Sequence, residues 1–261
     1  MKLIESSNNE FVKKVAKLKH KKYRDMYGVF CIEGERGVQE ALKHRERVQS
    51  IVLSSKIVDR QAELVHWLTT VNIECRIVQD DVFGALCDTV NNQGMLAIVY
   101  KPSNVTVDID ILASNHKHCL YLDRVADPGN MGAILRTARA TGFGLVWVNN
   151  CVDVYSPKVV RSAASGLFGL DVRMAVDILQ IKRHYSVVCT TPIGDNIYDS
   201  SVVQLPKGNK CLVIGNEANG IRQAILETSN YNISLPMLND LESLNAAVAA
   251  SVIMYKLAFD T

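Results

Sequence analysis

The sequence predicts an α/β protein with a largely parallel sheet, built from two consecutive units. Short apolar runs, typical of buried strands, alternate with helical patterns along most of the 261 residues. The run Lys-Pro-Ser-Asn at 101–104 interrupts this alternation and indicates a boundary between the units. Hydrophobic residues make up 48% of the chain, which is enough material for packed cores.

The first unit is predicted from a regular succession of elements. Ser6, Ser7 or Asn8 can cap a helix in which apolar residues recur at 11, 15 and 18. Further helices are predicted at 34–44, 59–70 and 80–87, and strands at 48–53, 73–78 and 95–100. Together these elements form a small three-layer unit of ordinary domain size.

The second unit is predicted to begin with a buried strand at 118–123, after a linker at 101–108. Helices follow at 131–141, 157–165 and 243–259, and strands at 145–148, 186–190 and 211–214. Strands that are separated by helices pair in parallel, so this unit holds most of the parallel sheet. The predicted domains are therefore 1–100 and 109–261.

The overall composition gives more information about the cellular location of the protein than about whether it binds nucleic acid. Lys and Arg number 29 against 27 Asp and Glu, a balance too even to indicate nucleic acid by itself. The seven cysteines are scattered and include no CxxC pair, which favours reduced thiols over disulfides or zinc. The start, MKLIESSNNE, is not a signal-peptide pattern, and no apolar run approaches membrane-spanning length. We therefore expect a cytoplasmic location.

One segment is strongly basic. Residues 12–24 read VKKVAKLKHKKYR, with seven cations and no acid. Such a helix can pair with phosphates and give salt-dependent affinity, although a solvated helix face is the ordinary alternative. Because no acid balances the run, we favour RNA contact. The candidate contacts are Lys13, Lys14, Lys17, Lys21, Lys22 and Arg24.

Three further segments have patterns that could carry chemistry. The first, DPGNMGAILR at 127–136, follows a strand and enters a helix, a position where α/β proteins bind ligands. Pro128 and Gly129 are predicted to make a turn, with Asn130 at the helix start. A capped helix with a solvated Arg136 is the purely structural explanation.

The other two segments lie near the end of the chain. CLVIGNEANG at 211–220 runs from a strand into a turn whose glycines allow a ligand to approach the backbone, although Glu217 could equally be an ordinary surface residue. ISLPMLNDLESLNAAVAA at 233–250 ends a strand in Leu-Pro-Met and opens an alanine-rich helix. Ser243 is its predicted N-cap, and a capped, buried helix is the structural explanation.

In this order and spacing, the three segments resemble the signature motifs of the SpoU (TrmH) family of RNA ribose 2′-O-methyltransferases, within the SPOUT superfamily. The resemblance implies S-adenosylmethionine as methyl donor and no metal. It also implies a trefoil-knotted α/β domain whose C-terminal segment threads through a loop, which general topology rules would not predict. Members of the family are homodimers, and the alanine face of the last helix would suit subunit packing.

The resemblance also assigns roles to individual residues. The residues that it implies for catalysis are Asn130, Arg136, Glu217, Ser243 and Asn245. The residues that it implies for binding the adenosyl group are Gly215, Leu235, Met237 and Leu244. The segment SPKVVRSAASGLF at 156–168 resembles the family's stretch after the first motif, and its arginine, Arg161, is expected to contact RNA.

The first hundred residues resemble the family's accessory RNA-binding domain, which is related to small ribosomal proteins that bind kink-turn RNA. Asn9, the lysines of the basic helix, GVFCIEG at 28–34 and Asn-Gln-Gly at 92–94 carry the similarity. This domain is commoner in ribosomal than in transfer RNA methyltransferases. Large-subunit rRNA is therefore the expected substrate, with transfer RNA as an alternative.

The expected chemistry is alignment of a ribose 2′-hydroxyl with the donor methyl group, with help in losing the hydroxyl proton. Arginine is almost never neutral in water, so Arg136 is expected to stabilise the developing alkoxide. Asn130, Ser243 and Asn245 would orient donor and acceptor. Glu217 would fix Arg136 or a neighbouring stretch of backbone.

Two other classes of protein compete with this interpretation. A Rossmann-type methyltransferase would need a glycine-rich loop after its first strand, and the chain contains no GxGxxG. A non-catalytic RNA-binding or ribosome-assembly protein could be built on a decayed methyltransferase. The intact residues of all three motifs argue against decay.

Overall fold

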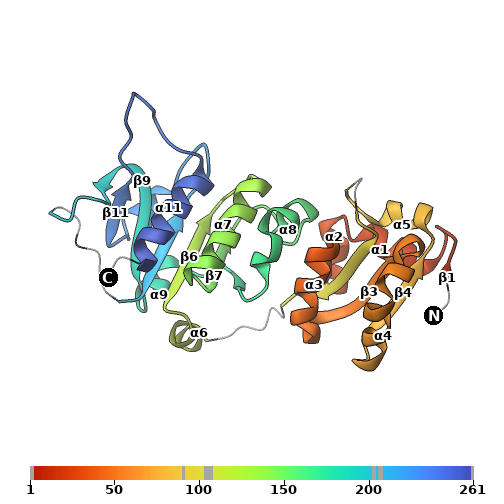
Figure 1. The fold of residues 1–261 in the computed structure, drawn as a ribbon. Helices are drawn as coiled ribbons and strands as arrows, with labels where there is room; N and C mark the ends of the chain where they lie inside the picture. Colours follow the sequence, from red (N-terminus) through yellow and green to blue (C-terminus); the bar gives the residue numbers. More distant parts are fainter. Residues whose placement is uncertain (1–2, 90–91, 103–107, 202–203, 205–207, 260–261) are drawn as a thin grey trace. The chain divides into compact units, whose positions relative to one another are not determined.

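The computed structural model describes residues 3–89, 92–102, 108–201, 204 and 208–259. The chain separates into two compact units (Figure 1). Unit 1 comprises Met1–Lys101 and Tyr155–Phe168, and unit 2 comprises Pro102–Val154 and Gly169–Thr261. Most of the predicted linker, 103–107, lies outside the described residues. Unit 1 thus includes a segment from the second half of the chain, and the predicted domain limits stay a prediction.

A five-stranded mixed sheet forms the centre of unit 1. Its strands, in spatial order, are β1 (Leu3–Ile4), β4 (Glu74–Val78), β3 (Val48–Ser54), β5 (Met95–Tyr100) and β2 (Val29–Glu33). The first three are parallel, and β5 is antiparallel to both of its neighbours. The strand predictions for β3, β4 and β5 are confirmed, and β2 was not predicted because GVFCIEG was interpreted only as a motif.

Helices cover the sheet of unit 1. They are α1 (Glu10–Lys17), α2 (Lys21–Tyr27), α3 (Glu35–Lys43), α4 (Ala62–Thr70), α5 (Asp80–Leu86) and α8 (Pro157–Ala163). Apolar residues of α1 and α5, such as Val15 and Phe83, form one core with Val52 and Leu96 of the sheet. The neighbouring residues along the strands point to the opposite face, on which α3 packs. The predicted three-layer arrangement is confirmed.

Unit 2 contains a six-stranded sheet in which every pair of neighbouring strands is parallel. Its strands, in spatial order, are β11 (Tyr231–Ser234), β9 (Ser186–Asn196), β10 (Lys210–Ile214), β6 (His118–Asp123), β7 (Leu145–Asn149) and β8 (Asp171–Met174). Both faces are covered, so β6 and β10 are buried along their whole length and their central residues are apolar (Figure 1). The parallel sheet was correctly predicted.

Two helical layers enclose this sheet. On one face lie α6 (Ile109–Asn115), α9 (Ile178–Lys182) and α10 (Gln223–Leu226), packed around Trp147 and Tyr121. On the other face α7 (Pro128–Thr141) packs against α11 (Ala246–Phe259). The three short helices α6, α9 and α10 were not predicted, because elements of four to seven residues give too little periodicity.

Two expectations on the whole chain need separate statements. Among the described residues, no helix combines the length and apolarity needed to cross a lipid bilayer. The knot implied by the resemblance stays a prediction.

Unit 2 depends on its central strands for stability. Leu122 on β6 is fully buried, and we expect Leu122→Ala to lower the free energy of unfolding of this unit by about 2–5 kcal/mol. Urea unfolding would be followed by the fluorescence of Trp147 in a Trp67→Phe background, so that only unit 2 is reported. Leu179→Ala, at an exposed position of α9, should change the value by less than about 0.5 kcal/mol. Equal effects of the two changes would contradict the described core.

Candidate active site

The candidate site lies where two neighbouring strands of unit 2 end. Strand β10 lies beside β6, but the chain leaves β6 toward β7 on one side and reaches β10 from β9 on the other. Such a reversal of strand order opens a crevice at the carboxyl edge of a parallel sheet, where ligands bind. The loops that follow β6 and β10 are the two segments that contain the first and second sequence motifs.

Glu217 joins these two loops. Its carboxylate accepts hydrogen bonds from the backbone N–H groups of Ala126 (3.1 Å) and Asp127 (3.0 Å). It accepts a third from the side-chain amide of Asn130, at 3.1 Å. We call these three hydrogen bonds the Glu217 clamp. Sequence analysis expected Glu217 to fix Arg136 or neighbouring backbone, and the structure has it fix the backbone and Asn130.

The clamp also sets the charge of the carboxyl group. Partial burial alone would raise the pKa of Glu217. The hydrogen bonds from Asn130 and from the backbone N–H groups outweigh burial, so the pKa lies below its ordinary value. Glu217 is therefore an anion at neutral pH, and its negative charge stabilises the first turn of α7, where helix N–H groups point outward.

Asn130 connects the clamp to the third motif. While its amide nitrogen donates to Glu217, its Oδ1 accepts a hydrogen bond from Nδ2 of Asn245, at 2.9 Å. Asn245 in turn accepts from the backbone N–H of Ala247 (2.9 Å), at the start of α11. One chain of side-chain hydrogen bonds thus links the three motifs, although they are far apart in the sequence.

The starts of both helices differ from the predictions. Helix α7 begins at Pro128, so Pro128 and Gly129 are helical residues and not a turn. Its N-cap is Asp127, whose Oδ1 accepts from the N–H of Asn130 at 2.7 Å. Helix α11 begins at Ala246 and is capped by Asn245, so the predicted N-cap Ser243 lies in the preceding loop.

The second motif forms a tight backbone turn. The backbone of Asn216 exchanges hydrogen bonds with Gly220, and its side-chain oxygen accepts from the N–H groups of Ala218 and Asn219. A Cβ at position 215 would lie 2.3 Å from the carbonyl carbon of Gly220, so only glycine fits there. The close approach that this glycine permits is therefore to the turn itself.

A buried acid holds this turn to the sheet. Asp123, at the end of β6, is fully buried. Its carboxylate accepts hydrogen bonds from the backbone N–H (3.2 Å) and Nε (2.9 Å) of Arg222, and from Nδ2 of Asn149. Arg124 contributes Nη2 to the carbonyl oxygen of Gly220, at 3.2 Å. These contacts fix the two ends of the turn that presents Glu217.

Arg136 is exposed on the third turn of α7. Within the part of the chain that the structure describes, its guanidinium makes no hydrogen bond or ion pair. A free guanidinium on the helix that begins with the Asn130 turn can receive an anionic group. The sequence analysis predicted a catalytic role for Arg136, and in the structure its positive charge is exposed to solvent.

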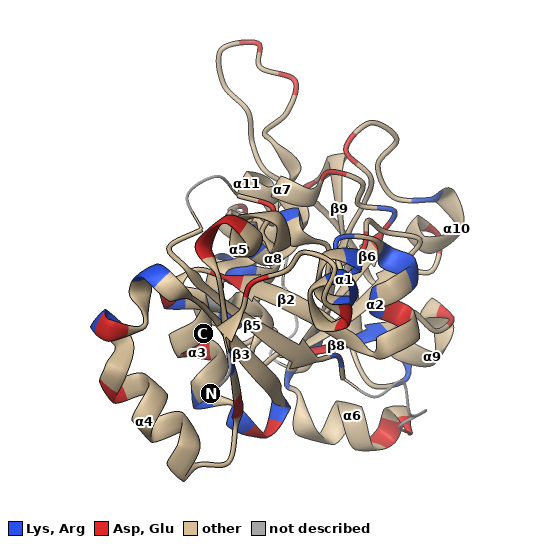
Figure 2. Cartoon of the chain, turned by 90° about the vertical axis from the view of Figure 1, so that its right-hand side faces the viewer, with Lys and Arg blue, Asp and Glu red and all other residues tan. Residues whose placement is uncertain are grey.

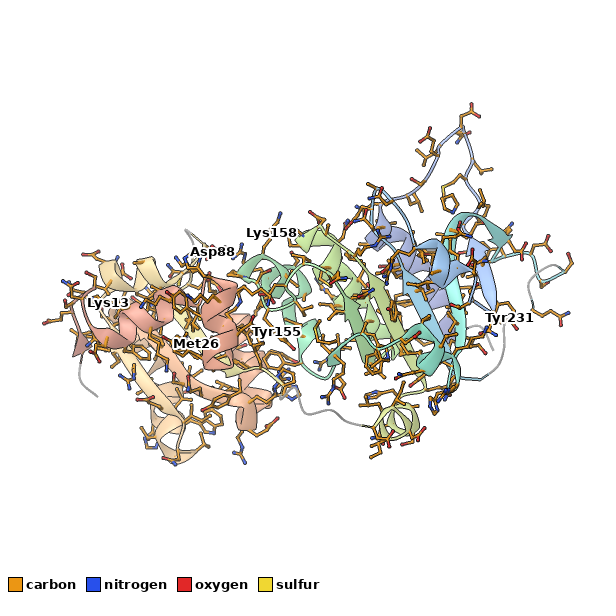
Figure 3. The ribbon with its side chains drawn as sticks, turned by 180° about the vertical axis from the view of Figure 1, so that it is seen from behind. Lys13, Met26, Asp88, Tyr155, Lys158 and Tyr231 are labelled. Atoms are coloured by element: carbon orange, nitrogen blue, oxygen red, sulfur yellow. The ribbon has the colours of Figure 1, made fainter. Side chains whose placement is uncertain are left out.

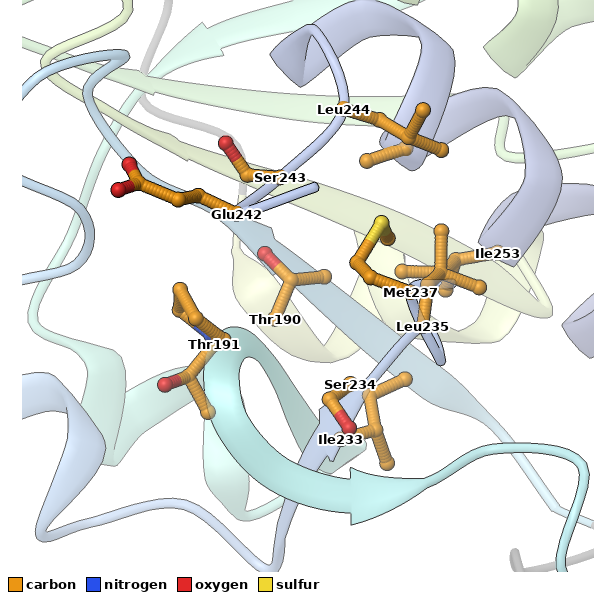
Figure 4. A pocket seen from close by; sticks show the side chains of 12 residues that line it. Thr190, Thr191, Ile233, Ser234, Leu235, Met237, Glu242, Ser243, Leu244 and Ile253 are labelled. Carbon is orange, nitrogen blue, oxygen red and sulfur yellow. The ribbon is translucent and has the colours of Figure 1, made fainter. Parts of the chain in front are cut away.

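A pocket of about 150 Å³ is lined by the middle of β9, the end of β11, the loop that leads into α11 and α11 itself (Figure 4). Leu235, Met237, Leu244 and Ile253 gather on one side of it. Its other lining residues are Thr190, Thr191, Pro192, Ile233, Ser234, Glu242, Ser243 and Ala249. Three of the four residues expected at the adenosyl group thus share one pocket with Ser243, whereas Gly215 is absent from its described lining.

The basic run of unit 1 folds as two helices and not one, with His20 between α1 and α2 (Figure 2). Several of its cations are used inside the protein. Arg24 is buried, and its Nη1 donates to the carbonyl oxygens of Leu18 and Lys19, both at 2.7 Å. Because its side chain is buried, we no longer include Arg24 among the residues predicted to contact RNA. Lys21 forms an ion pair with Asp25.

The exposed cations of the run are Lys13, Lys14, Lys17, Lys21 and Lys22, and of these Lys21 keeps its ion pair with Asp25. Lys13 is labelled in Figure 3. Arg161, on α8, forms an ion pair with Asp88 at 2.6 Å within unit 1. Binding of a phosphate by Arg161 would therefore have to compete with this carboxylate.

Among the described residues, no group of three or more His, Cys, Asp or Glu side chains could hold a metal ion. The structure adds residues that sequence reasoning did not select: Asp123, Asp127, Asn216 and Arg222 support the loops, and Thr190 and Thr191 line the pocket. Thr190 and Thr191 could have been found from their position near the end of the predicted strand 186–190. Asp123 could not have been found in this way, because its hydrogen-bond partner Arg222 is distant in the sequence.

The Glu217 clamp thus lies at the reversal point of a parallel α/β sheet. Family comparison gives the class: the model of the SpoU rRNA methylase family matches residues 117–255, and that of the MRM3-like substrate binding domain matches residues 9–97. The chain therefore belongs to the SpoU rRNA methylase family.

Individual relatives are similar over almost their whole length. The chain is 32% identical to the 23S rRNA (guanosine(2553)-2′-O)-methyltransferase RlmP of Bacillus subtilis, covering 98% of this chain and 99% of that protein. It is 31% identical to the 23S rRNA (uridine(2479)-2′-O)-methyltransferase of Streptomyces viridochromogenes, covering 97% and 90%. The AdoMet-bound rRNA methyltransferase of Sinorhizobium meliloti has a similar structure, with a TM-score of 0.83, 25% identity and coverage of 98% and 97%.

The lowered pKa of Glu217 predicts a pH-dependent cost of Glu217→Gln. A carboxyl whose pKa is lower in the folded state adds stability above its unfolded pKa, and this contribution disappears as the pH falls through the folded pKa. We expect the variant to be less stable than the wild type at neutral pH, with the difference shrinking in the acid range. Urea midpoints of unit 2, followed by Trp147 fluorescence, would measure this. A difference independent of pH would contradict the clamp.

Proposed function

We propose that this protein transfers a methyl group from S-adenosylmethionine to a ribose 2′-hydroxyl of large-subunit ribosomal RNA. The family assignment and the two relatives that methylate 23S rRNA support the reaction and the substrate class. The observation that carries the proposal is the hydrogen-bonded chain from Glu217 through Asn130 to Asn245, beside a partly apolar pocket. This arrangement fixes polar groups at the edge where donor and acceptor must meet.

The pocket has features that fit an adenosyl group. Its apolar side, which includes Leu235, Met237 and Leu244, can cover the faces of a purine, and the hydroxyl groups of threonine and serine residues in the rest of the lining can form hydrogen bonds. S-Adenosylmethionine supplies, when bound, a methyl group on a positively charged sulfur. We assign the same three side chains to the adenosyl group, together with the backbone at Gly215.

The residues of the clamp act on the acceptor. The ribose 2′-oxygen forms a bond to the methyl carbon as the carbon–sulfur bond breaks, and the hydroxyl proton leaves to solvent. We assign Asn130, Ser243 and Asn245 to orienting the reactants, because Asn130 and Asn245 are held by the hydrogen bonds described above. Arg136 keeps its proton and stabilises the negative charge that develops on the oxygen.

Substrate binding is assigned to the first hundred residues, with RNA phosphates bound by Lys13, Lys14, Lys17, Lys21 and Lys22. Arg161 contributes after exchanging Asp88 for a phosphate. The match to a substrate binding domain over residues 9–97 supports this assignment. We place the protein in the cytoplasm, with the two bacterial relatives named as 23S rRNA methyltransferases as support.

A homodimer is supported by the exposed face of α11. Sequence analysis expected the alanine face to suit subunit packing, but Ala247 and Ala250 are buried on the side of the helix that packs within unit 2. The opposite side carries the exposed apolar residues Val248, Val252, Tyr255 and Phe259. Exposed apolar residues that recur along one helix face mark an interaction surface.

The function is tested by transfer of labelled methyl from S-adenosylmethionine to undermethylated ribosomal RNA and, separately, to bulk transfer RNA. The label should appear on a ribose 2′-oxygen of the large-subunit RNA. Label only on transfer RNA would overturn the substrate class. Absence of both labelling and donor binding would favour a non-catalytic RNA-binding protein.

In the same assay, Arg136→Ala should lower the turnover rate by about 100-fold or more, because one stabilising donor at the reacting oxygen is lost. The dissociation constant of S-adenosylmethionine should stay within about twofold of the wild-type value, because Arg136 is assigned to the reacting oxygen and not to the methyl donor. Arg139→Ala, in the last turn of the same helix, serves as the matched control and should keep its activity. Loss of donor binding in Arg136→Ala would refute the assigned role.

The dimer is tested with Tyr255→Lys, which places a charge in the centre of the exposed face of α11. We expect the variant to sediment as a monomer while the wild type sediments as a dimer. Leu179→Lys, an equally exposed apolar position on α9, should leave the mass unchanged. A monomeric wild type would contradict the proposed dimer.

A further inference from the structure

Aromatic rings form a short stack along α2 of unit 1. The rings of Tyr23 and Tyr27 are stacked, with centroids 6.2 Å apart and an angle of 22° between their planes. His20, which precedes the helix, meets Tyr23 edge to face at 6.5 Å. Tyr27 also packs partly against the core of unit 1, so it is supported from beneath. Tyr23 is half-buried and has no such contact with that core.

Lysines surround the two tyrosine rings. The ammonium groups of Lys17 and Lys22 lie 5.3 Å and 5.9 Å from the ring centroid of Tyr23. That of Lys14 lies 4.8 Å from the centroid of Tyr27. We call these five residues the tyrosine–lysine surface. It combines the two features that proteins use to hold single-stranded nucleic acid: a flat ring and positive charge.

The remaining charges near this surface leave its positive potential intact. Asp25, the acid of α2, is paired with Lys21 and Lys101, and the hydrogen bonds from these lysines lower its pKa. Glu10 lies at the opposite end of α1 from Lys17. Met26, which is labelled in Figure 3, is exposed on the same helix three residues after Tyr23, a spacing that puts the two side chains on the same side of the helix.

We propose that the tyrosine–lysine surface binds an unpaired nucleotide of the RNA substrate, with its base stacked on Tyr23 and its flanking phosphates paired with Lys14, Lys17 and Lys22. The proposal rests on the proposed function, because it takes RNA as the ligand. A base stacks more strongly on an aromatic ring than an exposed lysine does, so the base displaces a lysine from the ring face toward the phosphates. An RNA helix could not make this contact, because its bases are already stacked.

This nucleotide site makes Tyr23 a determinant of which RNA region is held. Phosphate contacts by lysines alone carry no preference for single strands or for bases. A stacking ring requires a loop, bulge or end with an accessible base. The substrate class that follows is RNA with an unpaired stretch, held by unit 1.

The test uses the full-length protein and a single-stranded RNA oligonucleotide that contains 5-iodouridine. Ultraviolet irradiation should crosslink the modified base to Tyr23, as identified in the digested protein by mass spectrometry. In parallel, fluorescence anisotropy would measure the dissociation constant of the same RNA without the modified base. Binding of inorganic polyphosphate would report the lysines alone.

We expect Tyr23→Leu to weaken RNA binding about tenfold and to leave polyphosphate binding unchanged, because only stacking is lost. Tyr23→Phe keeps the ring and should bind RNA like the wild type. Tyr100→Leu, at an exposed tyrosine elsewhere in unit 1, is the control and should also bind normally. Lys17→Gln should weaken the binding of both RNA and polyphosphate, because a positive charge is lost.

The proposal is overturned if Tyr23→Leu and Tyr23→Phe bind RNA equally well, or if crosslinks avoid Tyr23. Circular dichroism would exclude unfolding of the Leu variant, whose polyphosphate binding is a second check of its fold. Binding and crosslinking require no methyl transfer. A protein that crosslinks through Tyr23 but never methylates RNA would refute the proposed reaction and leave the nucleotide site standing.

Discussion

The Glu217 clamp is the interaction on which the candidate active site depends. A single carboxylate receives three N–H groups from the neighbouring loop, and each of them would otherwise need water or another acceptor. Because two of the donors belong to the backbone, the clamp fixes where α7 begins as well as how one side chain is oriented. Asn130 can then use its oxygen for Asn245, and the third motif is positioned by the first.

The clamp works only because the sheet is parallel and covered on both faces. Parallel strands bring the loops after β6 and β10 to one edge, and the buried Asp123 holds the second loop there through Arg222. Removing a fully buried carboxylate would leave several polar groups unpaired, which is why such groups hold geometry firmly. The charged groups of the site are therefore fixed by the interior, while Arg136 stays free to meet the substrate.

Much of this arrangement could be predicted from the sequence, for reasons that can be stated. The apolar runs at the centre of β6 and β10 are recognisable because both faces of the sheet are buried, and the three motifs were identified by their resemblance to the signature motifs of a known family. The helix starts were wrong because a Pro at the first helical position and an Asn just before an alanine run can each be interpreted as part of a loop. The hydrogen bonds of Asp123 and the burial of Arg24 could not be predicted, since they depend on backbone groups that only the folded chain brings together.

The bond between Asn130 and Asn245 joins residues 115 positions apart in the chain. Closing a loop of that length costs conformational entropy that one hydrogen bond cannot offset. The side-chain network of the site therefore depends on the packing of α11 against α7. A chain in which these helices are apart would also have the residues of its candidate site apart, so the site exists only together with the packed fold.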